Sequence, residues 1–195
     1  KGADLSGSDL SSASLEAAQL SGAKFVGAKL VHARLNRAGA RDVDFSSANL
    51  EGADFGDANL YAARFRDANL TGARFPRTDM SESDLSGANL RGAFLSGANL
   101  RDAKLNGAHV EGARLEEAHL EGADLTGTGL TPARLTRHEP EMAACPECGG
   151  DGWKSDERTG ISYRCPMCDT HGKVRTGRTH DRVLAFWDER TVWDH

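Results

Sequence analysis

The feature that most constrains this chain is an apolar residue at every fifth position. From Leu5 to Leu135 this register holds for 27 consecutive positions without an insertion. Nineteen of these residues are Leu, and Phe, Ala, Met and Val fill the other positions. Two residues before each of them lies a second residue, which is Ala in 22 of the 27 cases. This regularity predicts a repeat protein in which successive five-residue units share one conformation.

A period of five fits neither an α-helix nor a flat strand. On a helix, steps of five turn successive residues by about 140° and scatter them over every face. On a flat strand, an odd step places successive apolar residues on opposite faces. The apolar residues all point the same way only if the chain bends once in each repeat and forms a closed coil that stacks on itself. The Gly, Ser or Asp that often lies two residues after an apolar position suits such corners, as at Gly7 and Gly52.

The charged residues indicate that four repeats make one coil. At every twentieth position from Asp4 to Asp124, acidic and basic residues alternate. If twenty residues form one coil, these side chains stack at roughly the 4.8 Å spacing of β-strands and neutralise one another. Asn49, Asn69 and Asn89 follow the same spacing and predict an amide ladder. The predicted fold is therefore an all-β solenoid with four repeats in each coil.

The repeat resembles that of the pentapeptide-repeat family, whose pattern is A(D/N)LXX. Examples are A-N-L-E-G at residues 48–52 and A-N-L-R-D at residues 98–102. The resemblance covers roughly residues 2–136 and implies a right-handed quadrilateral β-helix of about seven coils, with the Leu, Phe and Ala side chains turned inward. In that frame, one face stacks Phe25, Phe45 and Phe65, and the opposite face stacks Phe55 and Phe75.

The composition changes near residue 136 and predicts two domains. All four Cys and all three Trp lie beyond this point, whereas nearly all of the Ala, Asn and Leu precede it. We therefore expect a pentapeptide-repeat β-helix over residues 1–136. Residues 137–195 are expected to form a four-cysteine module with an apolar tail that contains Trp187 and Trp193. The tail is predicted to cap the open end of the solenoid, to form a homodimer contact or to bind a partner.

Two CxxC pairs predict a metal site in the second domain. The motif C-P-E-C spans Cys145 to Cys148, and C-P-M-C spans Cys165 to Cys168 after sixteen intervening residues. Each tight turn presents two thiolates, and two facing turns complete a tetrahedral site, so Zn²⁺ is the predicted cofactor. Iron and disulfides are the alternatives. The sequence G-G-D-G after the first pair is similar to one CxxCxGxG unit of the DnaJ-type chaperone zinc finger, a pattern that the second pair retains only in its later glycine.

Motifs and charge exclude several functional classes. The sequence contains no GxSxG, phosphate-binding loop or HExxH motif, so we expect that the chain is not an enzyme. Its 24 basic and 29 acidic residues give a net charge of −5, which makes direct nucleic-acid binding an unfavoured prediction. No apolar stretch approaches the roughly 18 residues of a membrane span, and no secretory signal opens the chain. A cytoplasmic protein is expected.

Phe94 occupies a position that is normally polar in the repeat. At a spacing of twenty, its neighbours in the predicted stack are Arg74 and Arg114. Two interpretations follow: a cation–π stack within the solenoid, or a binding hot spot for a partner, since aromatic residues and Arg dominate such spots. Together with Trp187 and Trp193, these residues form the predicted partner-binding set.

The leading functional hypothesis is a non-enzymatic scaffold, a rigid rod that presents the zinc module to a protein partner. The family resemblance implies an alternative, because Qnr- and MfpA-like members are acidic rods that resemble duplex DNA, bind DNA gyrase and protect it from inhibitors. Residues 1–136 carry 15 basic and 18 acidic groups in alternating columns, which fits a DNA mimic poorly. A second alternative is nucleic-acid binding through basic residues of the zinc module, which nearby acidic residues offset.

Overall fold

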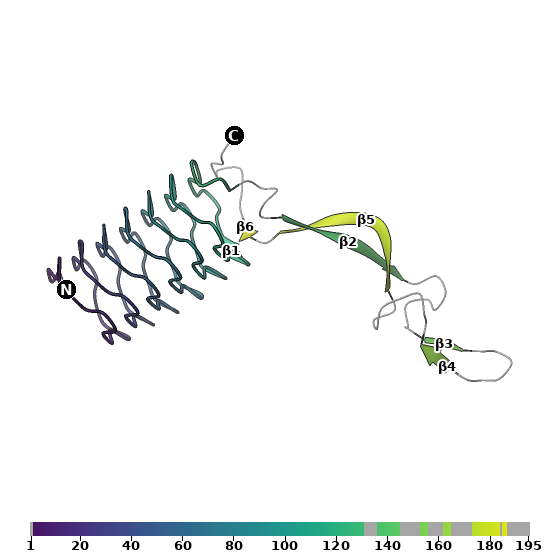
Figure 1. The fold of residues 1–195 in the computed structure, drawn as a ribbon, viewed down its shortest axis with the longest axis horizontal. Helices are drawn as coiled ribbons and strands as arrows, with labels where there is room; N and C mark the ends of the chain where they lie inside the picture. Colours follow the sequence, from purple (N-terminus) through teal and green to yellow (C-terminus); the bar gives the residue numbers. More distant parts are fainter. Residues whose placement is uncertain are drawn as a thin grey trace. The chain divides into compact units, whose positions relative to one another are not determined.

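In the computed structural model, residues 2–130 are described in full, and beyond them only the backbone of five strands is described. Residues 2–130 form a stack of coils, seen in Figure 1 from purple to teal, in which most strand pairing consists of single bridges. The strands are β1 (Ala118–His119), β2 (Thr136–Ala144), β3 (Trp153–Ser155), β4 (Ser162–Arg164), β5 (Lys173–Val183) and β6 (Ala185–Phe186).

Parallel bridges join residues that are twenty positions apart, from the pair Asp4 and Lys24 to the pair Lys104 and Asp124. Each five-residue repeat contributes one bridging residue, so four bridging positions fall in every coil. This confirms the predicted four repeats per coil and the all-β solenoid. The predicted total of about seven coils includes residues 131–135, which lie outside the described part, and stays a prediction.

Each corner is a tight turn in which the third residue has a positive φ. In the first such turn, Ser8 N–H donates to Leu5 O at 3.1 Å, and Gly7 between them has φ 69°. Many corners of the described solenoid carry other residues in this conformation, among them Ala62 at φ 53°. An L-residue with positive φ costs roughly 1–2 kcal/mol. The ladders to the coils above and below hold these residues in place, so the solenoid does not require Gly at every corner.

The Asp or Asn of the repeat completes the corner with its side chain. Asp4 Oδ1 accepts a hydrogen bond from Ser6 N–H at 3.0 Å, and Asn59 Oδ1 accepts one from Tyr61 N–H at 3.2 Å. The N–H group two residues on would otherwise point outward from the turn without a protein acceptor. This local bond is the Asx turn that favours Asp and Asn in turns, and it gives the polar position of the repeat a structural role.

The core is a column of fully buried Leu, Phe and Ala side chains. The Phe45 ring stacks on Phe25 and Phe65 with centroid distances of 4.9 and 5.3 Å. On the other side, Phe55 and Phe75 stack at 5.0 Å, and Phe55 meets the Phe45 ring edge-on at 5.9 Å. The two stacks confirm the predicted faces and show that they interlock across the core.

Two polar residues replace alanine in the core and differ in their hydrogen bonding. Thr78 and Ser83 are both fully buried. Thr78 Oγ1 donates to Phe55 O at 2.8 Å, whereas Ser83 Oγ is buried without a hydrogen-bond partner. A buried polar group that lacks a partner costs about 1–3 kcal/mol. Ser83 therefore weakens the solenoid locally.

Replacing Ser83 with alanine is expected to raise the free energy of unfolding by about 1 kcal/mol, because the orphaned hydroxyl is removed. The matched control is Thr78→Val, which is expected to lower it by about 1 kcal/mol, because the Phe55 carbonyl loses one of its two donors and keeps only the Ala58 N–H. Urea unfolding of both variants measures the two changes. A Ser83→Ala variant that is less stable than the unmodified chain would contradict this prediction.

The chain divides into two compact units. Unit 1 comprises Lys1–Leu135 together with Val183–His195, and unit 2 comprises Thr136–Arg182. The tail was predicted within the domain of the cysteine module, with capping of the solenoid as one of its roles, and Val183–His195 belongs to unit 1 together with the solenoid. The physical reason is that β6 pairs in parallel with β1, with Ala185 opposite Ala118 and Phe186 opposite His119 (Figure 1).

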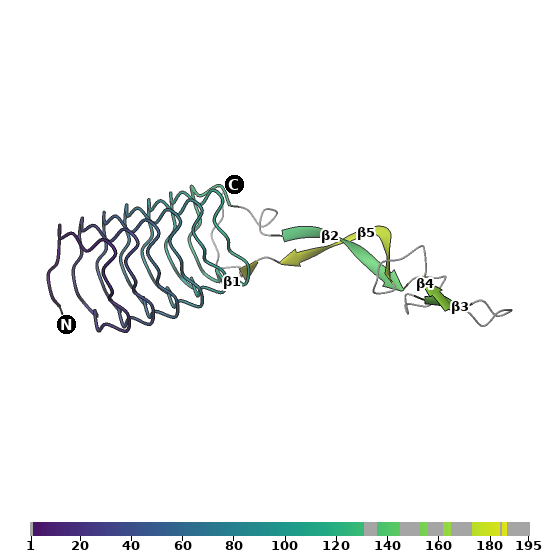
Figure 2. The same ribbon diagram turned by 60° about the horizontal axis from the view of Figure 1, so that its bottom comes forward.

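Unit 2 contains two separate ladders. Strands β3 and β4 pair antiparallel, with Trp153 opposite Arg164 and Ser155 opposite Ser162. Strands β2 and β5 form the other ladder, and their arrows run in opposite directions in Figure 2.

Within the described residues of the chain, no helix is long and apolar enough to cross a lipid bilayer.

Candidate protein-interaction surface

Arg74, Phe94 and Arg114 lie on three successive coils and form what we call the Phe94 column. Parallel bridges pair Phe94 with Arg74 on one side and with Arg114 on the other. The guanidinium carbon of Arg74 lies 5.5 Å from the centre of the Phe94 ring, and that of Arg114 lies 5.6 Å from it. The structure therefore brings together these three residues of the predicted partner-binding set.

Phe94 is exposed because it occupies the outward position of its repeat. Its exposed fraction is 37%, and among the described residues Val26 is the other large hydrophobic side chain that is similarly exposed. Phe94 has no oxygen to accept a bond from the N–H two residues on, so it gives up the Asx turn that Asp or Asn makes elsewhere. At this position, Phe94 thus stands in place of an Asp or Asn that would complete the turn. Only solvent or a partner contacts the outer side of its ring.

Glycines occupy the two corners that flank Phe94 in the chain. A Cβ atom added at Gly92 or at Gly97 would meet no atom within 4 Å, so both corners lie open to solvent.

The two arginines of the column keep most of their surface in solvent. Arg74 Nε lies 4.0 Å from Asp54 Oδ2, and Arg114 Nε lies 3.7 Å from Glu116 Oε1. Their side chains are 56% and 60% exposed, and ion pairs at such sites contribute about 0–1 kcal/mol. The two guanidinium groups therefore retain hydrogen-bonding capacity for an acidic group on a partner.

Glu116 is held ionised beside the Phe94 column. Its own backbone N–H binds the carboxylate and lowers the pKa of Glu116, with further help from Ser96 and Arg114, while partial burial acts in the opposite direction. Ser96 Oγ donates to Glu116 Oε2 at 2.9 Å. The carboxylate therefore stays negative at neutral pH and forms an exposed ion pair with Arg114.

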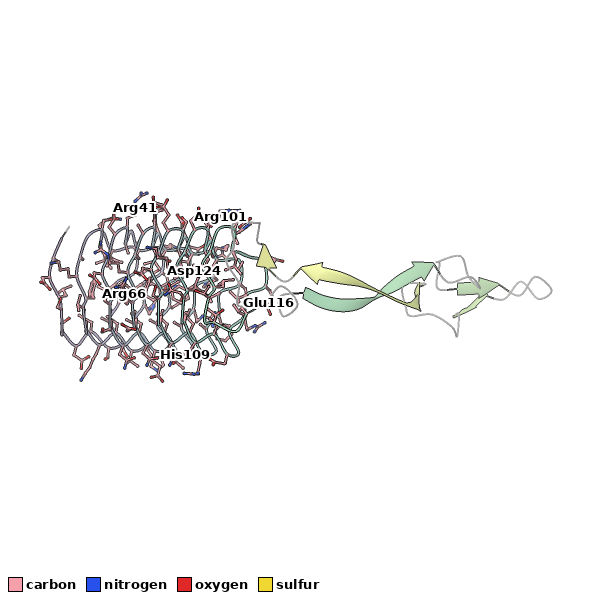
Figure 3. All side chains as sticks on the ribbon, turned by 90° about the horizontal axis from the view of Figure 1, so that it is seen from above. Arg41, Arg66, Arg101, His109, Glu116 and Asp124 are labelled. Atoms are coloured by element: carbon pink, nitrogen blue, oxygen red, sulfur yellow. The ribbon has the colours of Figure 1, made fainter. Side chains whose placement is uncertain are left out.

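Several ion pairs join neighbouring coils, and Figure 3 shows charged side chains along the outside of the solenoid. In the predicted alternating column, Arg64 Nη1 lies 3.8 Å from Asp44 Oδ2. A closer pair runs diagonally, with Arg66 Nη2 at 2.7 Å from Asp84 Oδ2. Charge neutralisation was predicted along each column. Ion pairs also form between columns, because long arginine side chains reach the neighbouring repeat.

The acidic residues near the end of the repeat are largely paired. Glu111 lies 3.2 Å from Arg91, Glu121 lies 3.1 Å from Arg101, and Glu116 contacts Arg114.

The predicted amide ladder forms at its first step only. Asn69 Nδ2 donates to Asn49 Oδ1 at 3.1 Å, whereas Asn89 Nδ2 donates to Thr71 Oγ1.

Sequence reasoning missed a second cation–π contact. The guanidinium carbon of Arg41 lies 4.4 Å from the centre of the Tyr61 ring. These residues are also twenty positions apart, so the spacing that identified the Phe94 column could have found them. Tyr61 additionally bonds to Glu82, which raises the pKa of its phenol. These contacts tie down Tyr61 on both sides.

The other predicted site residues lie outside the described part of the chain. They are Cys145, Cys148, Cys165, Cys168, Trp187 and Trp193. In the parts that the structure describes, no group of three or more His, Cys, Asp or Glu side chains could hold a metal ion. The zinc site and the contribution of the two tryptophans remain predictions.

The repeat matches two family models. Residues 2–75 match the model described as Pentapeptide repeat region, and residues 63–102 and 95–131 match the model described as Pentapeptide repeats. No curated protein matches the chain.

Solved structures with similar sequences include three whose descriptions differ. A trypsin-treated form of QnrB1, described as a plasmid-mediated fluoroquinolone resistance protein, is 24% identical over 66% of this chain and 65% of its own, with a TM-score of 0.48. HetL from Nostoc sp. strain PCC 7120, described as involved in heterocyst differentiation regulation, is 26% identical over 67% and 79%, with a TM-score of 0.31. Rfr23 from Cyanothece 51142 is 24% identical over 99% and 89%, with a TM-score of 0.29. The chain thus spans 65% of the length of QnrB1.

Proposed function

Because the chain belongs to the pentapeptide-repeat family, we propose that it is a non-enzymatic protein-interaction scaffold. Its solenoid is a rigid rod that binds a protein partner and presents a zinc-stapled C-terminal module. The observation that supports this function is the Phe94 column, in which an exposed aromatic ring lies between two arginines.

The Phe94 column has the composition of an interaction hot spot. Such spots are enriched in aromatic residues and Arg, and losing one central residue costs about 2 kcal/mol or more of binding free energy. The rigid coil holds the ring and both guanidinium groups in place before binding, which reduces the entropy lost on association. A partner segment with an apolar side chain and a nearby carboxylate would satisfy all three residues of the column.

The strand order of unit 2 supports a zinc site as part of this scaffold. Strand β2 ends directly before Cys145, and β5 begins shortly after Cys168. Strand β3 follows Cys148, and β4 ends directly before Cys165. The two CxxC pairs thus belong to the two segments that connect one ladder of unit 2 to the other. A Cys₄ site between two such connections is the arrangement of a structural zinc site.

The experiment compares partner capture by three forms of the 195-residue chain: the unmodified protein, Phe94→Asp and Val26→Asp. Val26 is the matched control, because it is 38% exposed, against 37% for Phe94. We expect a specific partner whose affinity falls about 30-fold or more with Phe94→Asp and stays within threefold with Val26→Asp. Quantitative mass spectrometry identifies the partner, and titration of the purified pair measures the affinities. Equal binding by all three chains would contradict the Phe94 column as the binding surface.

DNA gyrase is the alternative partner, and a supercoiling assay with purified gyrase tests it. The ion pairs of Glu111, Glu116 and Glu121 leave little of the sustained negative potential that a duplex mimic needs. We expect supercoiling to be unaffected at equimolar concentrations of the protein. Inhibition at low stoichiometry that Phe94→Asp leaves intact would replace the scaffold proposal with gyrase binding.

A further inference from the structure

We infer that β6 is the terminal rung of the solenoid, that is, the last strand paired onto its coils, and that unit 2 is inserted in the chain ahead of this rung. In this arrangement, pairing of β2 with β5 favours the pairing of β6 with β1. This inference concerns the end of the solenoid and does not depend on the proposed partner or metal. It is carried by a strand register, by the burial of the last coils and by the order of elements along the chain.

The register of β6 repeats that of an internal rung. Within the solenoid, Asn99 bridges His119 in parallel, twenty residues later. Phe186 bridges His119 in parallel as well, and Ala185 lies opposite Ala118. The tail therefore supplies the rung that a further repeat would have placed twenty residues after His119. Its sequence follows the repeat, since Ala185 precedes Phe186 as Ala118 precedes His119.

The burial of the last coils shows that this end of the core is covered. Ala118, Leu120 and Leu125 are fully buried. By contrast, Leu5 and Leu10, which have a coil on one side only, are partly exposed although they pack against the same core. Leu120 directly follows β1, the strand on which β6 pairs. Ala118, Leu120 and Leu125 thus have the burial of interior coils, whereas Ala113 and Leu130 at the same end are partly buried.

Closing this rung brings together two distant parts of the chain. Unit 2 lies between the last described repeat, which ends at Leu130, and β6, which begins at Ala185. With β2 and β5 paired, the ladder bridges most of the chain between Leu130 and Ala185, and the loop that must be closed is short. With the ladder open, the loop grows from roughly 8 to roughly 55 residues, and the closure probability falls about 10- to 20-fold. Pairing of β2 with β5 therefore favours the pairing of β6 with β1. We call β6 the cap and this effect of the ladder the clamp.

Amide hydrogen exchange in the full chain tests the rung. Internal rungs use the N–H of the residue at the Phe186 position, as in His119 N–H donating to Ala98 O at 2.9 Å. Phe186→Pro removes this donor, and Phe186→Leu is the control that keeps it. We expect exchange at Leu120 to become at least tenfold faster with Phe186→Pro alone, while exchange at Leu60 stays unchanged. Unchanged exchange at Leu120 would overturn the cap. Protection at Leu120 that depends on protein concentration would assign the rung to a second copy and also overturn it.

The clamp is tested by breaking β5 and leaving β6 intact. The double substitution Thr176→Pro and Gly177→Pro lies within β5 and removes two successive N–H groups, and substitution of both by alanine is the control. We expect about tenfold faster exchange at Leu120 with the proline pair. Equal exchange in both variants would overturn the clamp. Loss of partner binding in the earlier experiment has no bearing on these readouts, so the two proposals fail separately.

Discussion

Replacing Phe45 with alanine is expected to lower the free energy of unfolding of the solenoid by about 3–5 kcal/mol. The ring is fully buried and contacts three others, Phe25 and Phe65 by stacking and Phe55 edge-on. Aromatic pairs of this geometry contribute about 0.5–1.5 kcal/mol beyond the area that they bury. Ladder bonds to the coils above and below restrain the backbone, so the cavity has little room to collapse.

Urea unfolding, followed by circular dichroism, measures this effect, and Phe94→Ala is the matched control. The control removes the same side chain from the outside of the solenoid, where 37% of the residue is already exposed. Its expected cost is about 1 kcal/mol, the loss of two exposed cation–π contacts. If both variants lose the same free energy of unfolding, the stacked rings do not supply the expected stability of the core.

The second large effect concerns the four cysteines. Zinc content is expected to be about one per chain and to fall below half with Cys165→Ser, because a structural site requires four thiolates or imidazoles. Chelation is expected to unfold unit 2 and leave the solenoid folded. Its coils pack on one another through hydrophobic contacts that need no metal.

Elemental analysis and circular dichroism measure these changes, and Ser162→Ala in β4 is the control for a substitution in the same unit. Less than about half a zinc in the unmodified chain would contradict the Cys₄ assignment. Visible absorption together with bound iron would favour an iron site, and loss of unit 2 on treatment with reductant alone would favour disulfides.

The sequence predicted the solenoid and the Phe94 column for the same reason. Residues twenty positions apart are neighbours wherever four uninterrupted repeats form a coil, so a contact such as Phe94 with Arg74 follows from counting. The Phe stacks follow in the same way. Diagonal ion pairs such as Arg66 with Asp84 were missed, because the reach of a long side chain, rather than the period, determines them.

The sequence by itself determined the coil, its inward columns and the exposed ring of Phe94, because a one-dimensional stack repeats the same local contacts at a fixed separation. The sequence left three roles open for the tail, and only the tertiary structure decided that its strand β6 pairs with the solenoid. Nothing in the period indicates that Phe186 pairs with His119, since unit 2 lies between them in the chain. Such a pairing depends on an unpaired strand edge meeting a distant segment that can satisfy it, and this match exists only once the solenoid has formed.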